Sequence, residues 1–251
     1  MKDLKVKTIL VSQPKPENDK SPYFDLANKN KLTIDFRSFI HVEGLDAGDF
    51  RLQKINLLDF GDVIFTSRNA VDHYFRMADE MRVTIPDSMK YFCTSESTAY
   101  YLQKYVVYRK RKIFHGKARF ADLIPLLKKY GEGKFLLPTS DVLKSQIPDT
   151  LKKNDIEYER GIFYKTVCSD LSDLADVSYD ILVFFSPSGI KSLYQNYPDF
   201  KQNNTRIACF GPTTVSAAEE QGLVANIKAP SKESPSMTMA IEQYIKKTNK
   251  K

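Results

Sequence analysis

The sequence predicts an α/β protein built from two similar parallel sheets, each of five strands and covered by helices on both faces. Three observations lead to this prediction. Short apolar runs alternate with segments of helical spacing along most of the chain, which is typical of parallel strands joined by helices. Part of this pattern occurs twice. The length of 251 residues is sufficient for two such sheets with their own cores.

The duplication is clearest in two segments, "DVIFTSRNAV" at 62–71 and "ILVFFSPSGI" at 181–190. Each is an apolar run that stops at a serine and continues with small residues and a helical pattern. When Ser67 is aligned with Ser186, the phenylalanines two residues earlier also coincide. A second pair of segments, "YFCTSESTA" and "IACFGPTTV", follows in the same order. The chain therefore contains two copies of one structural unit.

The remaining segments complete an A-B-A-B order, in which A contributes two strands and B three. The A segments cover about 5–41 and 133–167, and the B segments cover about 60–128 and 179–247. In each A segment, a strand, a helix and a second strand follow one another. Their strands are expected at 7–14, 32–40, 134–140 and 156–167, with the second helix within 141–154.

The B segments alternate strands and helices through short loops. "DVIFTS" is an apolar run of the length expected for a strand that is buried on both faces. A single apolar stripe at helical spacing follows it, formed by Ala70, Val71, Tyr74, Phe75, Ala78 and Met81. The other expected strands are 90–95, 111–116, 181–186, 205–211 and 224–230, and the other helices are 97–105, 120–130 and 236–247.

The sequence pattern alone leaves open which A segment shares a sheet with which B segment. An in-order arrangement gives two consecutive domains. In the alternative, the first A segment joins the last B segment, and the middle of the chain forms an inserted domain.

Composition excludes some classes of protein and leaves others open. Hydrophobic residues are 42% and charged residues 27%, as in soluble globular proteins, and no apolar run is long enough to span a membrane. The N-terminus lacks the features of a signal peptide, so we expect a cytoplasmic protein. The net charge of +7 favours an anionic partner without identifying it.

Cysteine and histidine spacing does not predict a metal site or a disulfide framework. The three cysteines, Cys93, Cys168 and Cys209, are far apart and contain no C-x-x-C pair. The three histidines, at 41, 73 and 115, lie on separate segments. Neither a P-loop nor G-x-G-x-x-G occurs, so the common nucleotide motifs are missing.

Hydroxyl residues stand where the predicted strands end. In a parallel sheet, ligands bind at the carboxyl ends of the strands, where helices begin. We expect Ser67, Thr98, Ser186, Thr213 and Thr214 at such places. There they can cap a helix, or leave its backbone N–H groups open to an anion. Capping alone is the alternative explanation at each position, but several such residues on one edge favour an anion site shared by two facing domains.

Basic residues follow the same strands. Lys117 and Arg119 come after the strand at 111–116 and are candidates for anion binding, and Lys228 and Lys232 hold the matching place in the second copy. The run from Arg109 to Lys112 precedes the apolar core of its strand and is interpreted as a solvated face. A nucleic-acid-binding module would interleave aromatic and basic residues on one strip, whereas the aromatic residues here have core spacing.

Tyr164 ends an apolar run where the second A segment meets the last B segment. One interpretation is a core tyrosine whose hydroxyl reaches the surface. The other is a proton donor facing a ligand.

An ordered set of motifs resembles the uroporphyrinogen-III synthase family. The set consists of "VIFTSRNAV", "TA" at 98 and 99, "FYKTV", "FFSPSGI", "CFGPTTVSAAEEQG" and "APSKESPSMTMAI", and it covers nearly the whole chain. Each motif is weak alone, but their common order and spacing are moderately specific.

The resemblance implies two flavodoxin-like or Rossmann-like domains joined by a two-stranded connection near "RSFIHVEG" and "GIFYKTV". One domain would comprise 1–39 and 168–251, and the inserted domain 40–167. It also implies closure of the linear tetrapyrrole hydroxymethylbilane to uroporphyrinogen III in haem biosynthesis, with inversion of the terminal ring and loss of water. No metal or cofactor is implied. We expect a monomer whose partner is this polycarboxylate substrate, and neither nucleic acid nor membrane.

The resemblance also implies individual roles. Tyr164 matches the position proposed to protonate the leaving hydroxyl. The matching substrate-facing positions are Thr66, Ser67, Thr98, Ser186, Ser188, Thr213 and Thr214, to which the charge argument adds Lys117, Arg119 and Lys232.

Two departures from the family pattern concern carboxylate binding. Ser12 and Gln13 stand where the family often has Thr-Arg, and Asp141 and Lys144 occur where an arginine is common. The alternative functions are therefore a non-catalytic relative that binds a tetrapyrrole or another anion, and a basic nucleic-acid-binding module.

Overall fold

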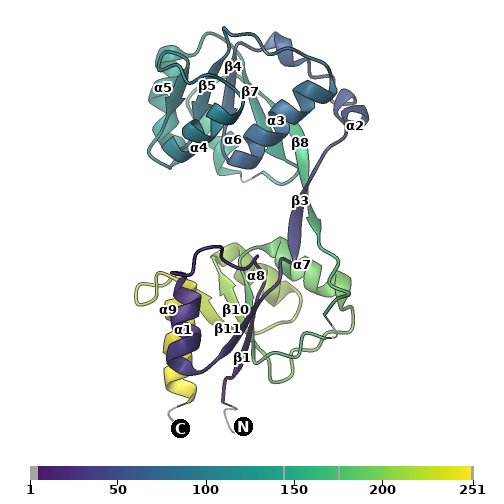
Figure 1. Ribbon diagram of the computed structural model, residues 1–251, viewed down its shortest axis with the longest axis vertical. Helices are drawn as coiled ribbons and strands as arrows, with labels where there is room; N and C mark the ends of the chain where they lie inside the picture. Colours follow the sequence, from purple (N-terminus) through teal and green to yellow (C-terminus); the bar gives the residue numbers. More distant parts are fainter. Residues whose placement is uncertain (1–4, 144, 175, 250–251) are drawn as a thin grey trace. The chain divides into compact units, whose positions relative to one another are not determined.

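The computed structural model describes residues 5–143, 145–174 and 176–249. The chain divides into two compact units (Figure 1). Unit 1 comprises Met1–His41 and Val167–Lys251, and unit 2 comprises Val42–Thr166. The chain passes from one unit to the other within β3 (Ile40–Gly44) and within β8 (Tyr158–Cys168), which are neighbouring strands. Two adjacent strands therefore carry both crossings.

Unit 1 contains a five-stranded sheet in the order β11-β10-β9-β1-β2, with every pair parallel. Its strands are β1 (Thr8–Val11), β2 (Thr33–Phe36), β9 (Ile181–Phe184), β10 (Arg206–Phe210) and β11 (Ala225–Ala229). Since β1 pairs directly with β9, the first A segment shares its sheet with the last B segment. Of the two arrangements that the sequence pattern left open, this pairing supports the one in which the middle of the chain is inserted.

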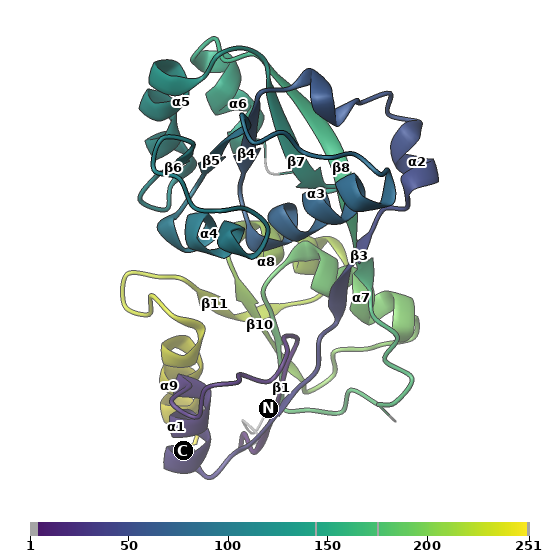
Figure 2. The ribbon, with the colours of Figure 1, turned by 45° about the horizontal axis from the view of Figure 1, so that its top comes forward.

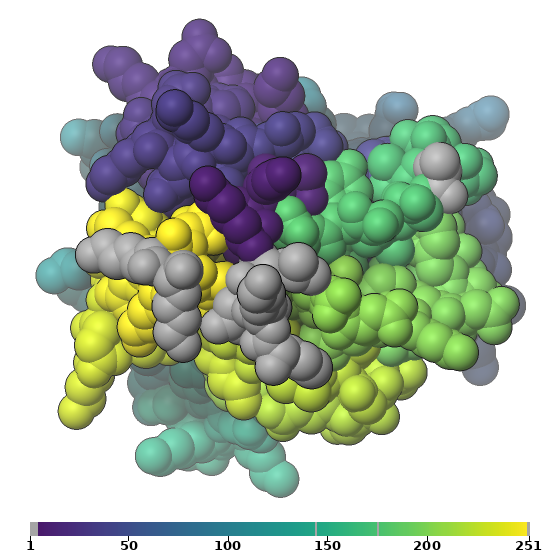
Figure 3. All heavy atoms as spheres, turned by 90° about the horizontal axis from the view of Figure 1, so that it is seen from below, coloured from purple at the N-terminus to yellow at the C-terminus, as the bar shows by residue number. Residues whose placement is uncertain are grey.

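Helices cover both faces of this sheet. On one face, α1 (Pro22–Asn30) and α9 (Met237–Thr248) lie side by side, although they come from opposite ends of the chain (Figure 3). Their apolar residues pack on Ile9, Val11 and Val183. On the other face, α7 (Pro187–Asn196) and α8 (Pro212–Glu220) pack on Leu10 and Phe184. Successive strand residues thus enter opposite cores, which explains why the strands read as continuous apolar runs.

Unit 2 repeats this construction in a six-stranded sheet of order β3-β8-β7-β4-β5-β6. The remaining strands are β4 (Asp62–Phe65), β5 (Lys90–Cys93), β6 (Ile113–His115) and β7 (Phe135–Ser140). When β3 is left out and this sheet is listed from its other edge, the order is β6-β5-β4-β7-β8. Both sheets then have three B strands followed by two A strands. The prediction of two similar parallel α/β sheets is confirmed. The expected number of five strands is wrong for unit 2, because the connecting strand β3 hydrogen-bonds to β8 and extends the sheet.

The helices of unit 2 are arranged in the same two layers (Figure 2). The first layer contains α3 (Arg68–Glu80), α4 (Glu96–Tyr101) and the 3₁₀ turn η2 (Leu102–Lys104), and it packs on Val63 and Phe65 of β4. The second layer contains η3 (Phe120–Leu123), α5 (Ile124–Tyr130) and α6 (Gln146–Lys153), and it packs on Ile64 of the same strand. The alternation along β4 therefore separates the two cores.

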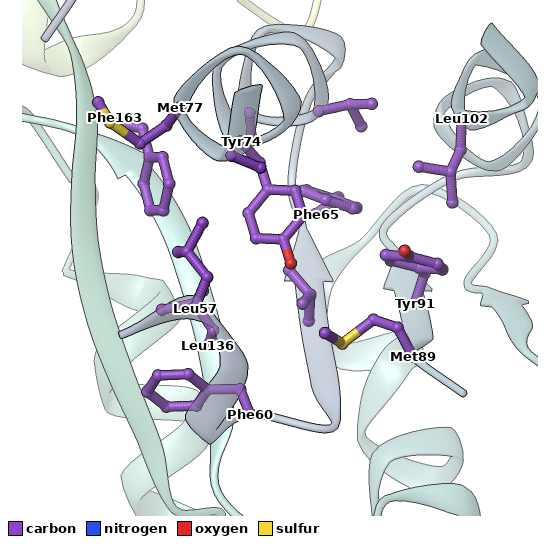
Figure 4. Packing of buried hydrophobic residues seen from close by; sticks show 14 of the residues in the cluster. Leu57, Phe60, Phe65, Tyr74, Met77, Met89, Tyr91, Leu102, Leu136 and Phe163 are labelled. Atoms are coloured by element: carbon purple, nitrogen blue, oxygen red, sulfur yellow. The ribbon is translucent and has the colours of Figure 1, made fainter. Parts of the chain in front are cut away.

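Two short elements were not predicted, α2 (Ala47–Arg51) and the 3₁₀ turn η1 (Leu57–Asp59). They are too short to show a periodic pattern, yet they bring Phe50, Leu57 and Phe60 into the α3 core. Figure 4 shows Leu57 between Phe163 and the ring of Tyr74, and Phe60 farther along the same core beside Leu136. The segment before β4 therefore closes this end of the core.

Candidate active site

The parallel strands of each sheet end at one edge, the carboxyl edge, where the predicted hydroxyl residues lie. In unit 2, β4 is followed by Thr66 and Ser67, and α3 begins at the next residue. Ser67 has an extended backbone, and its Oγ accepts a hydrogen bond from the Ala70 amide at 3.1 Å. Ser67 is therefore an N-cap, as predicted, and both Thr66 and Ser67 are half-buried.

The next turn differs in detail from the prediction. The N-cap of α4 is Ser95, whose Oγ accepts from the Thr98 amide at 3.3 Å. Thr98 lies within the first turn of the helix, is only 4% exposed, and has its hydroxyl 3.0 Å from the Ser95 Oγ. Thr98 therefore lies at the predicted junction of strand and helix, but Ser95 takes the capping role that was one of its two possible roles, because the strand ends early enough for a serine three residues before it to cap the helix.

Tyr164 reaches this edge from β8 through an irregularity in the strand. Thr139 of β7 faces Ile162, but the next residue, Ser140, faces Tyr164. Phe163 is therefore an extra residue, as in a β-bulge, and both Phe163 and Tyr164 pack into the α3 core. The bulge turns Tyr164 toward α3 instead of the opposite face of the sheet.

The phenol of Tyr164 lies beside the cap of α3. Its hydroxyl is 3.4 Å from the Oγ of Ser67, and the residue is 7% exposed. Burial raises the pKa of Tyr164 above its ordinary value of 10.0, and the hydrogen bond with Ser67 acts weakly in the opposite direction. The phenol consequently keeps its proton at neutral pH, which suits a donor rather than a base.

Two further residues of α3 complete this group. The His73 ring stacks on the ring of Tyr164 with 4.9 Å between centroids and 21° between planes. The Nε of Arg76 donates to the Nδ1 of His73 at 3.2 Å. Neither His73 nor Arg76 was predicted to belong to the site. The signal that could have revealed them is their i, i+3 spacing just outside the apolar stripe of the helix.

Lys117 and Arg119 follow β6 at the same edge, and both are exposed. Their backbone amides donate to the Oδ2 of Asp122, each at 3.2 Å, which fixes the loop. Among the residues that the structure describes, neither side chain has a hydrogen-bond or ion-pair partner. Both cations thus remain free to meet an anion.

Unit 1 presents a similar edge. Ser186 caps α7 by accepting from the Gly189 amide at 3.3 Å, and Ser188 lies in the first turn. The N-cap of α8 is Gly211, with a positive φ of 87°, so Thr213 and Thr214 lie in the first turn and do not cap the helix. Thr213 is exposed, whereas Thr214 is 1% exposed.

The cations of unit 1 differ from one another. The Nζ of Lys228 pairs with Glu219 at 2.9 Å, while Lys232 is exposed in the loop before α9. That loop ends at Ser236, which caps α9 through the Met239 amide at 3.3 Å. Lys232 is therefore the better candidate for an external anion.

The predicted residues thus form one group on each unit. Unit 2 carries Thr66, Ser67, Thr98, Lys117, Arg119 and Tyr164, and unit 1 carries Ser186, Ser188, Thr213, Thr214 and Lys232. That the two edges bound one common cleft stays a prediction.

Of the residues that depart from the family pattern, Ser12 and Asp141 are held within the fold. Ser12, at the end of β1, is 8% exposed, and Gln13 is exposed. The Oδ1 of Asp141 accepts from the Thr166 amide at 2.9 Å, so its carboxylate stabilises the loop after β7. Lys144 lies outside the described residues.

Other features lie away from these edges. A hollow of about 690 Å³ in unit 2 is lined by residues such as Val83, Met89 and Tyr105, at the start of β5 rather than its end. Within residues 5–143, 145–174 and 176–249, no cluster of three or more His, Cys, Asp or Glu side chains could hold a metal ion. In the same ranges, no helix combines the length and apolar character that a membrane crossing requires.

A family model, a curated relative and two solved structures that this chain resembles all represent uroporphyrinogen-III synthases. The family model described as "Uroporphyrinogen-III synthase HemD" matches residues 32–239. The uroporphyrinogen-III synthase of Saccharomyces cerevisiae is 26% identical over 139 residues, which cover 49% of this chain and 50% of the relative. The chain thus matches about half the length of this curated relative.

Two solved structures have a similar fold. The uroporphyrinogen-III synthetase of Helicobacter pylori has a TM-score of 0.56 and 18% identity, covering 96% of this chain and 99% of that one. A mutant uroporphyrinogen III synthase from the extremely thermophilic bacterium Thermus thermophilus has a TM-score of 0.54 and 13% identity, covering 98% and 100%. At such identities, these similarities establish the fold.

Proposed function

The chain belongs to the uroporphyrinogen-III synthase family, and we propose that it catalyses the reaction of that family. It closes the linear tetrapyrrole hydroxymethylbilane to uroporphyrinogen III, a step of haem biosynthesis, with inversion of the terminal pyrrole ring and loss of water. The observation that carries the proposal is the family match across 32–239, because this range contains every candidate site residue.

Substrate binding follows from the chemistry of the two carboxyl edges. Hydroxymethylbilane carries acetate and propionate arms on each ring, so it presents many carboxylates. The N-termini of α3 and α7 offer backbone N–H groups and the positive end of a helix dipole. Lys117, Arg119 and Lys232 add exposed cations. These groups bind several carboxylates without a dedicated charged motif.

Tyr164 is the proposed proton donor. The leaving hydroxyl departs as water when it receives the phenol proton, and the electron-rich pyrrole stabilises the cation that remains. A weak acid is sufficient for this step, and the phenol of Tyr164, whose pKa lies above 10.0, carries its proton at neutral pH. The residues that hold the chain then direct the terminal ring to attack through its substituted carbon, which is catalysis by positioning.

Other parts of the proposal concern the protein as a whole. We propose that 1–39 with 168–251, and 40–167, are its two domains. We also propose that it works in the cytoplasm as a monomer, without metal or cofactor and without binding nucleic acid.

The decisive assay supplies purified protein with hydroxymethylbilane and separates the cyclic products. The type III isomer is expected in excess over the type I ring that forms without the enzyme. Tetrapyrrole binding with no control of the isomer would identify a non-catalytic relative instead. Steeply salt-dependent retention on DNA or RNA, without turnover, would favour the nucleic-acid alternative.

A substitution tests the role of Tyr164. Tyr164→Phe is expected to lower kcat by about a hundredfold or more, since general acids contribute about 10²–10⁴. Tyr158→Phe removes a hydroxyl from the start of the same strand and should leave the rate unchanged. If the two variants have equal activity, Tyr164 has no part in the chemistry.

A further inference from the structure

At the carboxyl edge of unit 2, the ring of Tyr164 stacks on His73 and its hydroxyl lies near Ser67. We propose that His73 is a positioning residue, which holds the ring of Tyr164 so that its hydroxyl stays at the cap of α3. This inference rests on the proposed function, because it assigns a role in the same reaction.

The first support is the geometry of the two rings. The near-parallel stack of His73 on Tyr164 fixes the plane of the phenol, because a rotation about its ring axis would collide with the imidazole. The hydroxyl at the end of that ring is 3.4 Å from Ser67. One contact therefore sets the plane of the ring, and the other marks the position of its oxygen.

The second support is that His73 is itself held in place. A guanidinium can only donate, so the Nδ1 that receives the Arg76 Nε carries no proton. The imidazole is then neutral, with its proton on Nε2. Burial is the main cause that lowers the pKa of His73, and the positive charge of Arg76 lowers it further. The negative charges of Asp72 and Glu80 act in the opposite direction. The ring thus stays neutral against the phenol near neutral pH.

The third support comes from the backbone. The Nη2 of Arg76 donates to the carbonyl of Leu45 at 2.7 Å and to the carbonyl of Phe163, the extra residue of the bulge, at 3.2 Å. The amide of Leu45 donates to the same Phe163 carbonyl at 2.9 Å. Arg76 therefore fixes both the imidazole and the strand irregularity that directs Tyr164 toward α3. These contacts connect the bulge, the histidine and the phenol in one network.

Three variants test the proposal. His73→Ala removes the stacked ring, whereas His73→Phe keeps a flat ring that cannot accept from Arg76. Phe75→Ala is the matched control. Phe75 lies on the same helix, and its ring stacks on the ring of Tyr105 with 4.5 Å between centroids and 5° between planes. The substitution therefore removes a stacked ring whose stacking partner is Tyr105 rather than Tyr164.

We expect His73→Ala to lower kcat about tenfold or more and to leave KM within about twofold, since a displacement of about 1 Å can cost about a hundredfold. His73→Phe should recover most of the lost kcat. Phe75→Ala should reduce stability but leave kcat unchanged at a temperature where it is folded.

A second measurement does not depend on activity. With ¹³C-labelled tyrosine, the Tyr164 signal is identified by its loss in Tyr164→Phe, and its titration gives the phenol pKa. That pKa should fall toward 10.0 in His73→Ala, because water reaches the ring, and should change little in Phe75→Ala.

The outcomes separate the two proposals. A wild-type protein that forms no uroporphyrinogen III refutes the proposed function, while the phenol titration still tests the placement by His73. An active wild type whose His73→Ala variant keeps both its kcat and its phenol pKa overturns the positioning role. A loss of kcat that His73→Phe does not restore, with an unchanged phenol pKa, also overturns it.

Discussion

Ser67 has two roles that substitution can separate. Its Oγ caps α3 through the Ala70 amide at 3.1 Å, and it lies 3.4 Å from the Tyr164 hydroxyl. Loss of a serine cap to alanine costs about 1 kcal/mol. The longer contact is near the limit of hydrogen bonding, so it adds at most about 0.5 kcal/mol. We therefore expect Ser67→Ala to lower the free energy of unfolding of unit 2 by about 1–1.5 kcal/mol.

The duplicated fold supplies an internal control for the cap. Ser186 has the same extended backbone and accepts from Gly189 at 3.3 Å, but its described contacts include no tyrosine. Ser186→Ala should cost unit 1 about 1 kcal/mol. Urea unfolding followed by signals from each unit measures both costs.

Glycine separates capping from the effect on the phenol. Ser67→Gly should cost only a few tenths of a kcal/mol, because glycine is an acceptable N-cap residue. It still removes the partner that lowers the pKa of Tyr164. Ser67→Gly and Ser67→Ala should consequently lose the same share of kcat, although their stabilities differ. Full activity of the glycine variant, with a loss only in the alanine variant, would refute this reasoning, since the loss would then follow stability.

Three other predictions concern residues other than Ser67. In Gly161→Ala, the new Cβ would lie 2.5 Å from the packed Phe163 ring, so the urea midpoint should fall by the equivalent of about 1–3 kcal/mol. A thiol reagent at pH 8 should modify Cys168 in the folded protein but neither Cys93 nor Cys209. Burial raises the thiol pKa of Cys93 to about 12 and that of Cys209 to about 11. Modification of all three cysteines before unfolding would contradict this. Because the pKa of His73 is lowered on folding, the unfolded chain binds the proton first, and stability should fall as the pH drops below 6.5 toward the folded-state pKa. The denaturant midpoint of His73→Phe should lack this slope, and an unchanged slope would show that another group causes it.

The repeated fold could be predicted because parallel strands leave a strong signal. Strands buried on both faces are apolar at nearly every position, as in the four fully buried residues of β4 and of β9. The stripe of α3 is equally clear, since one face of a helix meets the sheet. The hydrogen-bond pairing of β3 was harder to predict, because four of its five residues are exposed and show no apolar alternation.

The candidate site was predictable only in part. Ser67 and Ser186 follow from the junction of a strand and a helix, because capping depends on local sequence. Thr98 and Ser95 compete for one cap, and the exact end of β5 decides between them. The grouping of His73 and Arg76 around Tyr164 depends on the bulge, and an extra unpaired residue leaves no periodic signal in sequence.

The two units share a framework, yet an aromatic residue of the second A strand, Phe36 in unit 1 and Tyr164 in unit 2, lies on a different face of each sheet. In unit 1, β1 and β2 stay in register to the end, where Val11 faces Phe36, and Phe36 packs against Tyr23 of α1. In unit 2, the corresponding strand contains the bulge, and Tyr164, the last of its residues that pairs with β7, lies against α3, on the layer equivalent to α7 and α8. Because strand residues alternate between faces, one inserted residue is sufficient to move an aromatic ring from one layer to the other. Tyr164 can therefore meet the cap of α3, whereas Phe36 lies in the other layer of unit 1 and carries no hydroxyl. This difference gives a physical reason why Tyr164 is the proposed proton donor.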